Sequence, residues 1–384
     1  MDILQILPYF SPKHGGSATS PYQISRALSK RGHNVTIYTT DLDTKKSSFE
    51  INSGLRVIQF HCVANIGGLL ITPAMGNQLK NEIKDFEVIH AHNFRTYQNI
   101  IVQRYARKCK VPYILQAQGS MPKIGKKKGK WFYDQLLGFK ILKNASKVLA
   151  LTETEAKQYK QAGIPSSKIV IIPNGIDLSE YNDLPLRGMF RAKFGINEDN
   201  KIILFLGRLH WIKGIDNLLR AFARLKKGSK FDNILLVLAG PDDGFLSTLN
   251  SLINKLRIKD SVLITGPLYD REKLEAYIDA DIYILPSRYE TFPMTVLEAI
   301  ACETPIILSD KCGITATIKD KVGIVVKPSP KEIQIALLQL LSDEDLQKRF
   351  RDNCRIILKQ FDIANIAVKL EKLYNEVIEV SDPK

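Results

Sequence analysis

The sequence predicts an α/β protein made of two doubly wound, Rossmann-like domains. Short apolar runs alternate with amphipathic stretches along all 384 residues, and this alternation is typical of parallel sheets with helical crossovers. Several of the runs are apolar on both faces, which fits strands covered by helices on either side. A segment rich in Pro, Gly, Asn and Asp, residues 172–188, interrupts the alternation near the middle and predicts a linker.

The two halves repeat the same arrangement of elements. In the first half, helices are expected over 17–30 and 94–108, and strands over 2–7, 34–39, 55–60, 87–92, 112–117, 147–152 and 168–173. In the second half, a periodic helix is expected over 361–380, and strands over 201–207, 233–240, 261–266, 281–287, 305–310 and 323–327. We expect an N-terminal domain over residues 1–175 and a C-terminal domain over 176–361. Such sheets bind ligands at the carboxyl ends of their strands, so the cleft between the domains is the expected active site.

The net charge of +15 comes entirely from the first half of the chain. Residues 1–175 hold 25 Lys and Arg against 10 Asp and Glu, whereas residues 176–384 hold 30 of each kind. This asymmetry predicts an anionic partner of the N-terminal half: nucleic acid, a membrane surface or a phosphorylated substrate. The alternative is a soluble surface that is basic without such a partner. No apolar run is long enough to span a bilayer, and the five dispersed cysteines lack zinc-site spacing. We expect reduced thiols and a cytoplasmic location.

The most informative stretch is "RYETFPMTVLEAIACETPI", residues 288–306. Glu290 lies on the loop after an expected strand, and Glu298 lies one turn inside the next helix. Unpaired N–H groups at such a helix start bind anions such as phosphate. The residues expected there are Pro293, Met294, Thr295 and Val296. The two carboxylates then suit hydroxyl groups at two parts of one ligand. Two alternatives stay open, because Thr295 and Glu298 have capping-box spacing and Glu290 also fits a solvated loop.

A second group of candidate residues lies in "FLGRLHWIKGID", 205–216. A strand ends at Gly207, Arg208 follows at once, and Lys213 comes just before the next helix. Two cations at the carboxyl end of a strand suit a diphosphate whose negative charge grows as it leaves. Gly207 allows the backbone to come close to a ligand. The alternative is an ordinary surface loop that carries an Arg and a Lys.

The N-terminal half offers weaker signals. Gly15 and Gly16 lie between the first strand and its helix, where a loop can pass close to a ligand, although they match neither common phosphate-loop pattern. In "EVIHAHN", 87–93, His90 and His92 lie on one side of a strand end. Without a third ligand nearby they predict no metal site, but a neutral imidazole can bind a sugar hydroxyl. A packing role is the alternative, more for His90 than for His92, and which of them faces the site stays open.

Lysines stand beside aromatic residues in "PKIGKKKGKWFYDQLLGFK", 122–140. The pattern suits an anionic phospholipid surface or a lipid-diphosphate acceptor, and a solvated loop before a packed helix is an equal alternative. The lysines concerned are Lys123, Lys126, Lys127, Lys128 and Lys130. Elsewhere, Asp279 and Asp281 have the spacing of a metal–diphosphate motif. They precede a strand, away from its carboxyl end, so we expect no metal there.

Five motifs, taken in order, resemble the retaining glycosyltransferases of family 4, which have the GT-B fold. They are the loop "P-x-x-G-G" with "LSKRGHNVT", the strand end "HAH", the linker "IPNGID", "GRL-x-x-x-KG" and the paired-glutamate stretch "ETFPMTVLEAIAC-x-TPII". The resemblance spans essentially the whole chain. It implies that two domains face each other across a cleft, that the first binds the acceptor and the second the donor, and that the last helix, about 362–384, crosses back to the first domain.

The resemblance also implies roles for single residues of the second half. Glu290 would contact the hydroxyls of the donor sugar, and Glu298 the ribose of the nucleotide. Arg208 and Lys213 would hold the diphosphate. The family often has Gly where this chain has Pro293, and this departure removes one backbone N–H donor.

In the first half, His92 would lie near the donor sugar and the reaction centre, and Gly16 near the phosphates. We therefore expect transfer of a sugar, with retention, from a UDP- or GDP-linked donor to a glycan or lipid-linked acceptor. The resemblance is to enzymes of bacterial or archaeal surface glycans, such as polysaccharide or lipopolysaccharide, and implies no metal or other cofactor. Same-face displacement is favoured, because Glu290 is the only motif acid near enough to act as a nucleophile and its family role is hydroxyl binding.

The basic N-terminal half then predicts peripheral attachment to the inner face of the plasma membrane. Two other functions are weighed against transfer. One is a UDP-GlcNAc 2-epimerase on the same scaffold, which the order of motifs does not fit. The other is a nucleic-acid-binding protein, for which the sequence offers no recognition helix or aromatic platform. The donor base, donor sugar, acceptor, linkage and oligomeric state do not follow from the sequence.

Overall fold

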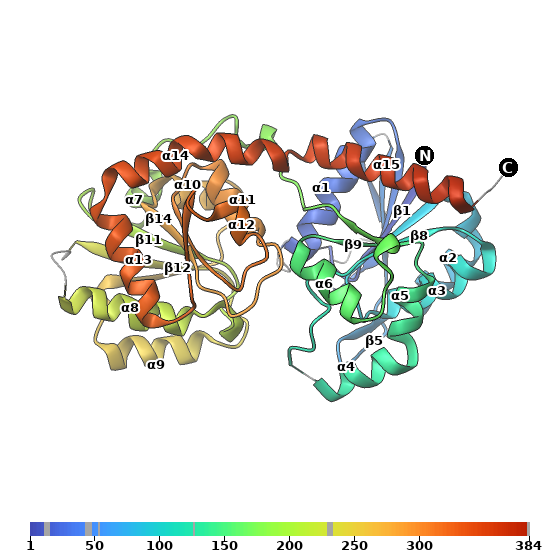
Figure 1. The fold of residues 1–384 in the computed structure, drawn as a ribbon, viewed down its shortest axis with the longest axis horizontal. Coiled ribbons are helices and arrows are strands. Elements are labelled where there is room, and N and C mark those ends of the chain that lie inside the picture. The colour runs from blue at the N-terminus through green and yellow to red at the C-terminus, as the bar shows by residue number, and fades with distance from the viewer. Residues whose placement is uncertain (11–15, 43–47, 53, 126, 229–232, 382–384) are drawn as a thin grey trace. The chain divides into compact units, whose positions relative to one another are not determined.

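The computed structural model describes residues 1–10, 16–42, 48–52, 54–125, 127–228 and 233–381. It divides the chain into two compact units. Unit 1 is Met1–Gly175 with Ile363–Lys384, and unit 2 is Ile176–Asp362. In each unit a mainly parallel sheet is flanked by helices (Figure 1). The prediction of an α/β protein with two Rossmann-like domains is therefore confirmed.

In the described part of the chain, the sheet of unit 1 has eight strands in the order β10-β9-β8-β7-β1-β2-β4-β3. Its expected strands are β1 (Asp2–Ile6), β2 (Asn34–Thr40), β4 (Leu55–Phe60), β7 (Val88–His92), β8 (Tyr113–Gln116), β9 (Lys147–Ala150) and β10 (Ile169–Ile171). The sequence does not predict the antiparallel edge strand β3 (Ser48–Asn52) or the hairpin of β5 (Ala64–Ile66) and β6 (Leu69–Ile71). The sequence of β3, SFEIN, has no continuous apolar run, and two three-residue strands around Gly67 and Gly68 resemble a turn.

The helices of unit 1 are α1 (Gly16–Lys30), α2 (Pro73–Glu82), α3 (Tyr97–Cys109), α4 (Lys127–Tyr133), α5 (Phe139–Asn144), α6 (Glu153–Gln161) and α15 (Ile363–Ser381), with the short turns η2 (Ile83–Asp85) and η4 (Ser166–Lys168) and the π-helical η3 (Asp134–Gly138). Helix α3 begins later than the expected residue 94, because the Thr96 hydroxyl caps it and accepts a hydrogen bond from the Asn99 N–H at 3.1 Å. The last helix, α15, belongs to unit 1, as the resemblance implies.

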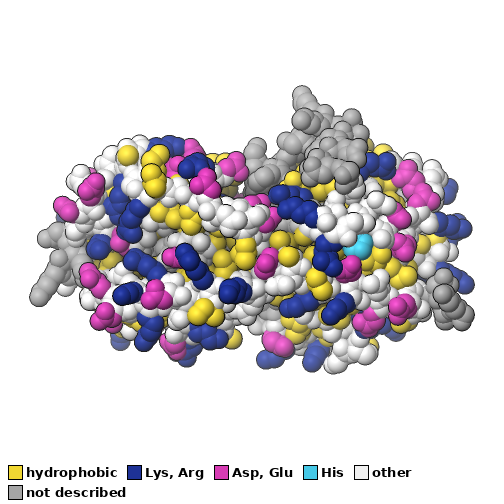
Figure 2. Space-filling model, turned by 90° about the horizontal axis from the view of Figure 1, so that it is seen from above, with side chains coloured by type: hydrophobic (Ala, Val, Ile, Leu, Met, Phe, Trp, Pro, Cys, Tyr) yellow, Lys and Arg dark blue, Asp and Glu magenta, His cyan; other side chains and the backbone are white. Residues whose placement is uncertain are grey.

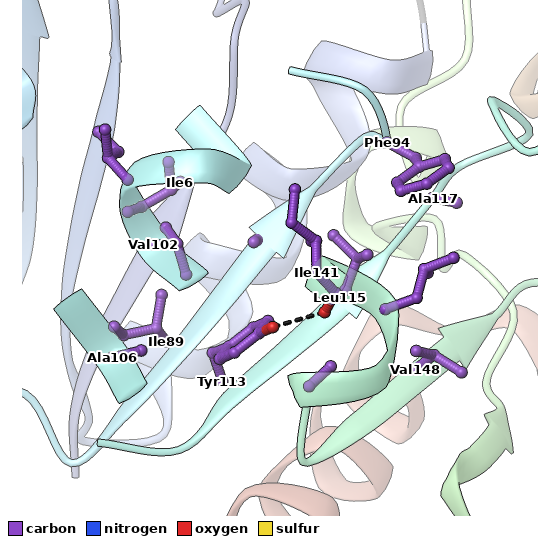
Figure 3. Close-up of a cluster of buried hydrophobic side chains, with 14 of the residues drawn as sticks. Ile6, Ile89, Phe94, Val102, Ala106, Tyr113, Leu115, Ala117, Ile141 and Val148 are labelled. Carbon is purple, nitrogen blue, oxygen red and sulfur yellow. Dashed lines mark hydrogen bonds between the residues drawn. The ribbon is translucent and has the colours of Figure 1, made fainter. Parts of the chain in front are cut away.

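The core of unit 1 forms where strands β1, β7, β8 and β9 meet helices α3 and α5 (Figure 3). Ile6, Ile89 and Leu115 are fully buried there. Tyr113 is buried among them and donates its hydroxyl to the Ile141 carbonyl oxygen at 2.5 Å. Its one polar group is therefore satisfied inside an apolar cluster. This packing fixes the carboxyl ends of β7 and β8.

Unit 2 has a six-stranded parallel sheet in the order β13-β12-β11-β14-β15-β16 within the described residues. The strands are β11 (Lys201–Leu206), β12 (Ile234–Ala239), β13 (Val262–Gly266), β14 (Ile282–Leu285), β15 (Ile306–Ser309) and β16 (Gly323–Val326). Strands β11 and β14 are neighbours, and the chain adds its next strands outward from them in opposite directions: β12 and β13 beyond β11, and β15 and β16 beyond β14. Such a switch point is where open α/β sheets bind ligands.

The helices of unit 2 are α7 (Met189–Phe194), α8 (Ile215–Gly228), α9 (Leu246–Leu256), α10 (Asp270–Asp279), α11 (Met294–Ala301), α12 (Thr315–Ile318), α13 (Pro330–Ser342) and α14 (Glu344–Leu358), with the short turns η5 (Leu178–Tyr181), η6 (Trp211–Lys213), η7 (Lys259–Ser261) and η8 (Lys359–Phe361). Strands β11 and β14 are almost fully buried, as their unbroken apolar sequences predict. Loops at their carboxyl ends therefore carry the polar chemistry of this edge.

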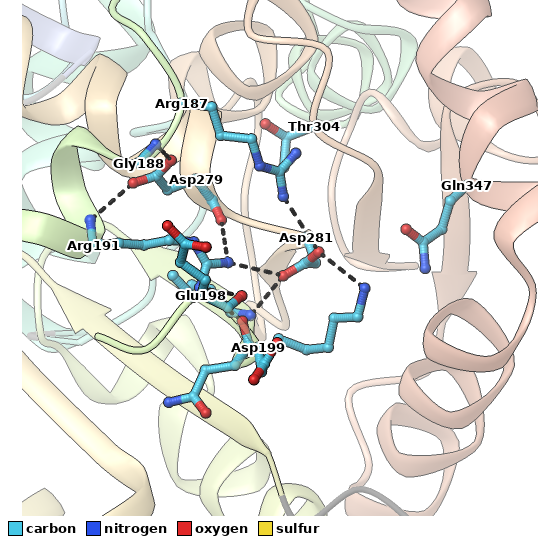
Figure 4. A network of polar contacts seen from close by, with 12 residues as sticks. Arg187, Gly188, Arg191, Glu198, Asp199, Asp279, Asp281, Thr304 and Gln347 are labelled. Atoms are coloured by element: carbon cyan, nitrogen blue, oxygen red, sulfur yellow. Dashed lines mark hydrogen bonds and ion pairs between the residues drawn. The ribbon is translucent and has the colours of Figure 1, made fainter. Parts of the chain in front are cut away.

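A polar network at the opposite end of β14 accounts for Asp279 and Asp281 (Figure 4). At the start of α7, the Asp279 carboxylate accepts hydrogen bonds from the backbone N–H groups of Gly188 at 2.5 Å and Arg191 at 2.9 Å. Asp281 accepts the Ile202 N–H at 2.8 Å and lies 3.6 Å from the Arg191 guanidinium. Both acids therefore hold α7 and β11 in place. Among the described residues, no group of three His, Cys, Asp or Glu is placed to bind a metal.

The surface carries both signs of charge. On the face seen in Figure 2, Lys and Arg side chains are scattered among acidic side chains instead of forming one patch. The five cysteines have free thiols. In the part of the chain that the structure describes, no helix is long and apolar enough to cross a bilayer.

Candidate functional site

The switch point of unit 2 begins with a close approach of two backbones. A Cβ atom on Gly240, after β12, would lie 1.9 Å from the Gly207 carbonyl oxygen, after β11. The next residue, Arg208, forms an ion pair with Asp243 in which both side chains are nearly half exposed. The loops are also joined by the Leu209 N–H, which donates to the Pro241 carbonyl at 2.8 Å. Arg208 is therefore held beside the carboxyl ends of β11 and β12 but stays accessible.

Lys213 reaches across the switch point to Glu290. Its ammonium donates a hydrogen bond to Oε2 of Glu290, and both side chains are mostly buried. The next residue, Gly214, has a φ of +70°, and a Cβ there would lie 2.2 Å from the Pro286 carbonyl oxygen. Only glycine fits such a position. The pair Lys213–Gly214 thus fixes the turn η6 against the loop after β14.

The loop that carries Glu290 is held on its other side by the segment after β15. The Glu290 N–H donates to the Lys311 carbonyl at 3.1 Å, and its carbonyl accepts from the Gly313 N–H at 2.9 Å. The backbone of Glu290 is fixed on both sides, and its side chain, paired with Lys213, is only 19% exposed. The alternative of a freely solvated loop acid is therefore wrong.

Helix α11 begins at Met294, with Pro293 at the N-cap position and no side-chain cap. Thr295 is therefore not the cap, and its hydroxyl instead accepts a hydrogen bond from Tyr283 at 2.7 Å. The capping-box alternative for Thr295 and Glu298 is wrong, because the helix starts one residue before Thr295. Val296 lies on the same first turn and is fully buried. The first N–H groups of a helix have no partner inside it, so this turn can still hold an anion.

Glu298 has two partners from helix α10. Its Oε1 lies 2.7 Å from the Lys273 ammonium, and its Oε2 accepts the Tyr277 hydroxyl at 3.1 Å. Burial by itself would lower the pKa of Lys273, but the charge and hydrogen bond of Glu298 prevail and raise it. The carboxylate of Glu298 is therefore oriented before any ligand binds.

The four charged residues expected from the sequence lie around the carboxyl ends of β11 and β14. Burial raises the pKa of Tyr283 well above its usual value, and the charges of Glu298 and Glu290 act in the same direction. On the other side, burial lowers the pKa of His210, Asp243 opposes this shift, and Arg208 and Lys213 add to it. Both glutamates therefore shift the pKa of the same tyrosine, Tyr283, and both cations shift the pKa of the same histidine, His210. The two shifted residues lie at one edge of the sheet.

His92 is the last residue of β7 in unit 1 and is fully buried. Its Nε2–H donates to Oε1 of Gln5 at 2.5 Å, and its Nδ1 accepts from Nε2 of Gln118 at 2.9 Å. Burial holds its pKa well below the usual value, and the neighbouring His90 adds to the shift. The imidazole of His92 is therefore neutral, and both of its nitrogens are engaged by side chains of unit 1.

His90 lies deeper in the same strand. Its Nδ1 is 2.7 Å from the Tyr374 hydroxyl of α15, and its ring centroid is 4.2 Å from that of His92. Burial lowers the pKa of His90 to about 3. A packing role fits His90, since it ties α15 to the sheet. Gly16 is the first residue of α1, and Gly15 lies outside the described residues.

Three residues without the freedom of glycine have left-handed backbones at the carboxyl edge of the unit 1 sheet. Asn93, Arg95 and Gln118 have φ values of +64°, +63° and +50°, and they follow β7 and β8. The Arg95 side chain fixes this edge, because it forms a buried ion pair with Asp134 at 2.7 Å. Such strain persists where the surroundings demand it and is frequent at functional sites. The sequence gives no signal for these residues.

The basic segment is only partly free. Lys123 lies 3.5 Å from Asp134, and Lys130 donates to the Ile124 carbonyl at 2.5 Å. Lys128 is exposed. Lys126 and the side chain of Lys127 lie outside the described residues. The helix that follows packs through Tyr133 and Asp134, which are buried, but it leaves its outer face uncovered.

That face exposes large apolar side chains. Trp131, Phe132 and Leu136 are 54%, 60% and 57% exposed, and Phe139 is 40% exposed. They belong to the continuous helical run of α4, η3 and α5. An apolar face of this kind, next to lysines, is typical of a surface that meets a membrane or another protein.

Four residues of the unit 2 site lie outside the sequence motifs: Asp243, Lys273, Tyr277 and Tyr283. The two tyrosines stand in the run "LEAYIDADIYIL", 274–285, where their hydroxyls interrupt an apolar pattern. A buried tyrosine usually needs a hydrogen-bond partner for its hydroxyl, so these two tyrosines were the one signal in the sequence for a buried polar site here. Lys273 and Asp243 carry no such mark.

Family models match both halves of the chain. Residues 14–180 match "Glycosyltransferase Family 4", and residues 187–356 match "Glycosyl transferases group 1". An uncharacterized glycosyltransferase of Methanocaldococcus jannaschii is 26% identical over 383 residues, which cover 95% of each chain. The D-inositol 3-phosphate glycosyltransferase of Kineococcus radiotolerans is 25% identical and covers 86% of this chain and 83% of its own.

Solved structures share the fold. The sucrose-phosphate synthase of Thermosynechococcus elongatus has a TM-score of 0.84 at 21% identity over 99% of both chains. Anabaena HepE in complex with UDP-glucose has a TM-score of 0.80 at 17% identity, over 98% of this chain and 100% of its own. Matches to both halves, in the order of the motifs and with this fold, show that the chain is a glycosyltransferase of group 1 with the GT-B fold.

Proposed function

We propose that the protein transfers a sugar, with retention of its anomeric configuration, from a UDP- or GDP-linked donor to a glycan or lipid-linked acceptor. One observation carries the proposal: Arg208, Lys213, Glu290 and Glu298 gather at the switch point of unit 2. There the cations suit a diphosphate, and the carboxylates suit the hydroxyls of the sugar and the ribose. The solved HepE structure, by its title, holds UDP-glucose, which supports a nucleotide-sugar donor.

Arg208 would exchange its partner when a donor binds. Its pair with Asp243 is nearly half exposed, and such surface pairs contribute at most about 1 kcal/mol. A diphosphate carries more negative charge than one carboxylate and can accept two parallel bonds from the guanidinium. The Arg208 fork is therefore available to the ligand at little loss of stability.

In the proposed reaction the acceptor hydroxyl attacks the anomeric carbon from the face on which the phosphate departs. The bond from that carbon to the phosphate oxygen breaks, and its electron pair goes to the leaving nucleoside diphosphate. The proton of the acceptor hydroxyl passes to the same phosphate oxygen as the new glycosidic bond forms. Arg208 and Lys213 stabilise the growing charge, so we propose that no metal ion is needed.

We propose a lipid-linked glycan at an anionic membrane surface as the acceptor. The exposed face of Trp131, Phe132 and Leu136, with Lys128 beside it, supports contact with the inner face of the plasma membrane. A second candidate is a small phosphorylated polyol, because the name of the Kineococcus relative includes D-inositol 3-phosphate. Membership of the glycosyltransferase family favours transfer over epimerisation of UDP-GlcNAc.

A thermal-shift screen over UDP-, GDP- and ADP-sugars tests the donor. A true donor in hundredfold excess over its dissociation constant stabilises the native state by about 2.7 kcal/mol. The donor that stabilises is then incubated, with and without EDTA, with a polyprenyl-linked sugar in vesicles or with D-inositol 3-phosphate. NMR of the product reports the anomer. Stabilisation by no nucleotide sugar, or an inverted product, would overturn the proposal, and activity lost in EDTA would overturn its metal-free form.

A further inference from the structure

A groove runs between helices α8 and α9 of unit 2, outside the switch point. Two neighbouring hollows, of 530 Å³ and 360 Å³, share Arg220, Leu252 and Lys255 on their walls and so form one groove. It begins at Trp211 and Phe245 and continues along α8 to Arg224 and Lys227. From Arg220 to Lys227 alone it spans roughly 10 Å of helix, which is longer than one sugar ring.

The groove is strongly basic, although the chain from residue 176 onward is neutral as a whole. Its only carboxylate among the described lining residues is Asp216. Both oxygens of that carboxylate are already paired. They accept hydrogen bonds at 2.9 Å from both terminal nitrogens of Arg288, and at 2.9 Å from one terminal nitrogen of Arg220. The other cations of the groove are Arg224, Lys227 and Lys255. Within the described residues, none of these three has an acidic side chain within ion-pair distance. The groove thus carries positive charge that its own walls do not neutralise.

The cations on α8 have a regular spacing. Arg220, Arg224 and Lys227 are four and three positions apart, so they lie on one face of the helix, about 5–6 Å from one to the next. A polymer with one negative charge on each repeating unit complements such a row. Arg presents a planar fork that fits a carboxylate.

The end of the groove near the switch point is aromatic. Trp211 is 46% exposed, and the Arg288 guanidinium lies 5.8 Å from its ring centroid. The apolar face of a sugar ring packs on such a ring, and the exposed hydroxyls of Thr248 and Ser251 offer hydrogen bonds beside it. Trp211 belongs to the same turn, η6, as Lys213.

We propose that the α8–α9 groove binds an acidic saccharide chain, with carboxylates on successive sugars, at a site separate from the donor site. The chain stacks one sugar on Trp211 and places its carboxylates along Arg220, Arg224 and Lys227. A single-stranded nucleic acid fits less well. Its binding tracks repeat aromatic platforms along the strand, whereas the walls beyond Trp211 and Phe245 are lined by Ala223, Leu252 and Leu256. The site does not depend on the identity of the donor.

Fluorescence of Trp211 gives a direct readout. The sequence has two tryptophans, so Trp131→Phe leaves Trp211 as the only one. This variant is titrated, without nucleotide sugar, with oligogalacturonate, with a neutral maltooligosaccharide of the same length and with oligodeoxythymidylate of the same charge. We expect saturable binding of the uronate that weakens as salt rises and little binding of the other two. Failure of the uronate to bind, or equal binding of the oligonucleotide, overturns the proposal.

Charge reversal tests the row of cations. Arg224→Glu with Lys227→Glu should weaken uronate binding by at least about tenfold. The matched control is Lys369→Glu with Lys372→Glu on α15, which changes the net charge equally at two exposed positions with the same spacing. It should leave the affinity within about twofold. Equal losses in both variants would mean attraction by overall charge and would overturn the site. Circular dichroism checks that both variants fold, and donor-induced thermal shifts, measured separately, report on the proposed function.

Discussion

The Lys213 ammonium donates a hydrogen bond to the Glu290 carboxylate, although the two residues are 77 positions apart. The contact joins the turn after β11 to the loop after β14, which are the two strands at the switch point of the unit 2 sheet. It brings a cation and an acid side by side at this edge of the sheet, where the proposed donor would have its sugar and diphosphate. From the sequence, we expect the cations at the diphosphate, in the middle of the ligand, and the acids at the sugar and the ribose on either side. In the structure, Lys213 and Glu290 instead contact each other directly.

The first prediction concerns the glycine that shapes this contact. Gly214→Ala should destabilise unit 2 by at least about 3 kcal/mol, because the new Cβ would overlap the Pro286 carbonyl oxygen. It should also lower turnover, because Lys213 moves with the turn. Urea denaturation and the initial rate of transfer measure the two effects.

Gly195→Ala is the matched control for this change. Gly195 has a φ of +63°, close to that of Gly214, but no atom lies within 4 Å of a Cβ built there. Its substitution should destabilise the protein by only about 1–2 kcal/mol, through backbone strain alone. If the two variants lose the same stability, the clash with Pro286 does not explain the glycine.

The second prediction separates the role of Arg208 in catalysis from the contribution of its ion pair with Asp243 to stability. Arg208→Ala should lower turnover by about 10²–10³ and change the free energy of unfolding by less than about 1 kcal/mol, since the pair with Asp243 is near the surface. Steady-state kinetics with the donor found by thermal shift, together with urea denaturation, provide the test.

Asp243→Asn provides the contrast, because it removes the partner and keeps the guanidinium. Turnover of this variant should stay within about threefold of the wild type, a change of less than 1 kcal/mol in the barrier. Near-full turnover of Arg208→Ala would rule out leaving-group stabilisation by this residue.

Most of this edge of the sheet could be predicted from the sequence. Strands β11 and β14 are unbroken apolar runs, and Arg208, Lys213 and Glu290 follow them directly, so their position at the carboxyl edge follows from topology. The capping-box alternative arose because Thr295 and Glu298 fit the pattern T-x-x-E, whereas Pro293 occupies the N-cap position.

The partners of these residues could not be predicted in the same way. Lys273 and Tyr277 meet Glu298 only because α10 packs beside α11, and no local pattern encodes that distance. For the face of Trp131 and Phe132, the sequence left a lipid-facing surface and a packed helix as equal alternatives, for a related reason. Aromatic residues in a helix usually face a core, and the sequence alone does not tell whether a second layer covers them.

The third prediction concerns the contact of Glu298 with Lys273. Glu298→Ala leaves a mostly buried ammonium without its carboxylate, so it should destabilise the protein by about 1–3 kcal/mol and abolish stabilisation by the nucleoside diphosphate. Replacing both residues by methionine, Glu298→Met with Lys273→Met, should regain most of the stability, since an apolar pair can replace a buried ion pair. It should not regain nucleotide binding. Recovery of both properties in the double variant would contradict a role of Glu298 in holding the ribose.

The fourth prediction concerns the exposed apolar face of α4 and η3. Trp131→Ser with Phe132→Ser should weaken binding to vesicles that contain phosphatidylglycerol by at least about tenfold, because burying each of these side chains contributes about 1.5–3 kcal/mol. Flotation of the protein with such vesicles measures the loss.

The control for the membrane prediction removes two other exposed apolar side chains, with Leu186→Ser and Ile356→Ser in unit 2. This variant should float with the vesicles as the wild type does. Neither variant should change the free energy of unfolding by more than about 0.5 kcal/mol, as is usual for surface substitutions. A wild-type protein that does not associate with anionic vesicles would remove the basis for a membrane acceptor.

The fifth prediction uses the buried imidazoles of unit 1. Burial lowers the pKa of His90 from 6.5 to about 3, so between these values the unfolded chain binds a proton that the folded chain does not. Stability that is fully present above about pH 6.5 should therefore fall as the pH drops, by about 1.4 kcal/mol per pH unit for this residue. His92 has a lowered pKa as well and adds to the slope.

His90→Gln removes one of the two titrations and keeps a polar group opposite the Tyr374 hydroxyl. The free energy of unfolding of this variant should depend less steeply on pH than that of the wild type, by about 1.4 kcal/mol per unit between about pH 6 and pH 4. Carboxylates that titrate in the same range affect both proteins and cancel in the difference. Urea denaturation at several pH values gives the two slopes. Equal slopes would mean that His90 is protonated in the folded protein near its usual pKa, or that it is not buried beneath α15. The contact between His90 and the Tyr374 hydroxyl would then have to be abandoned.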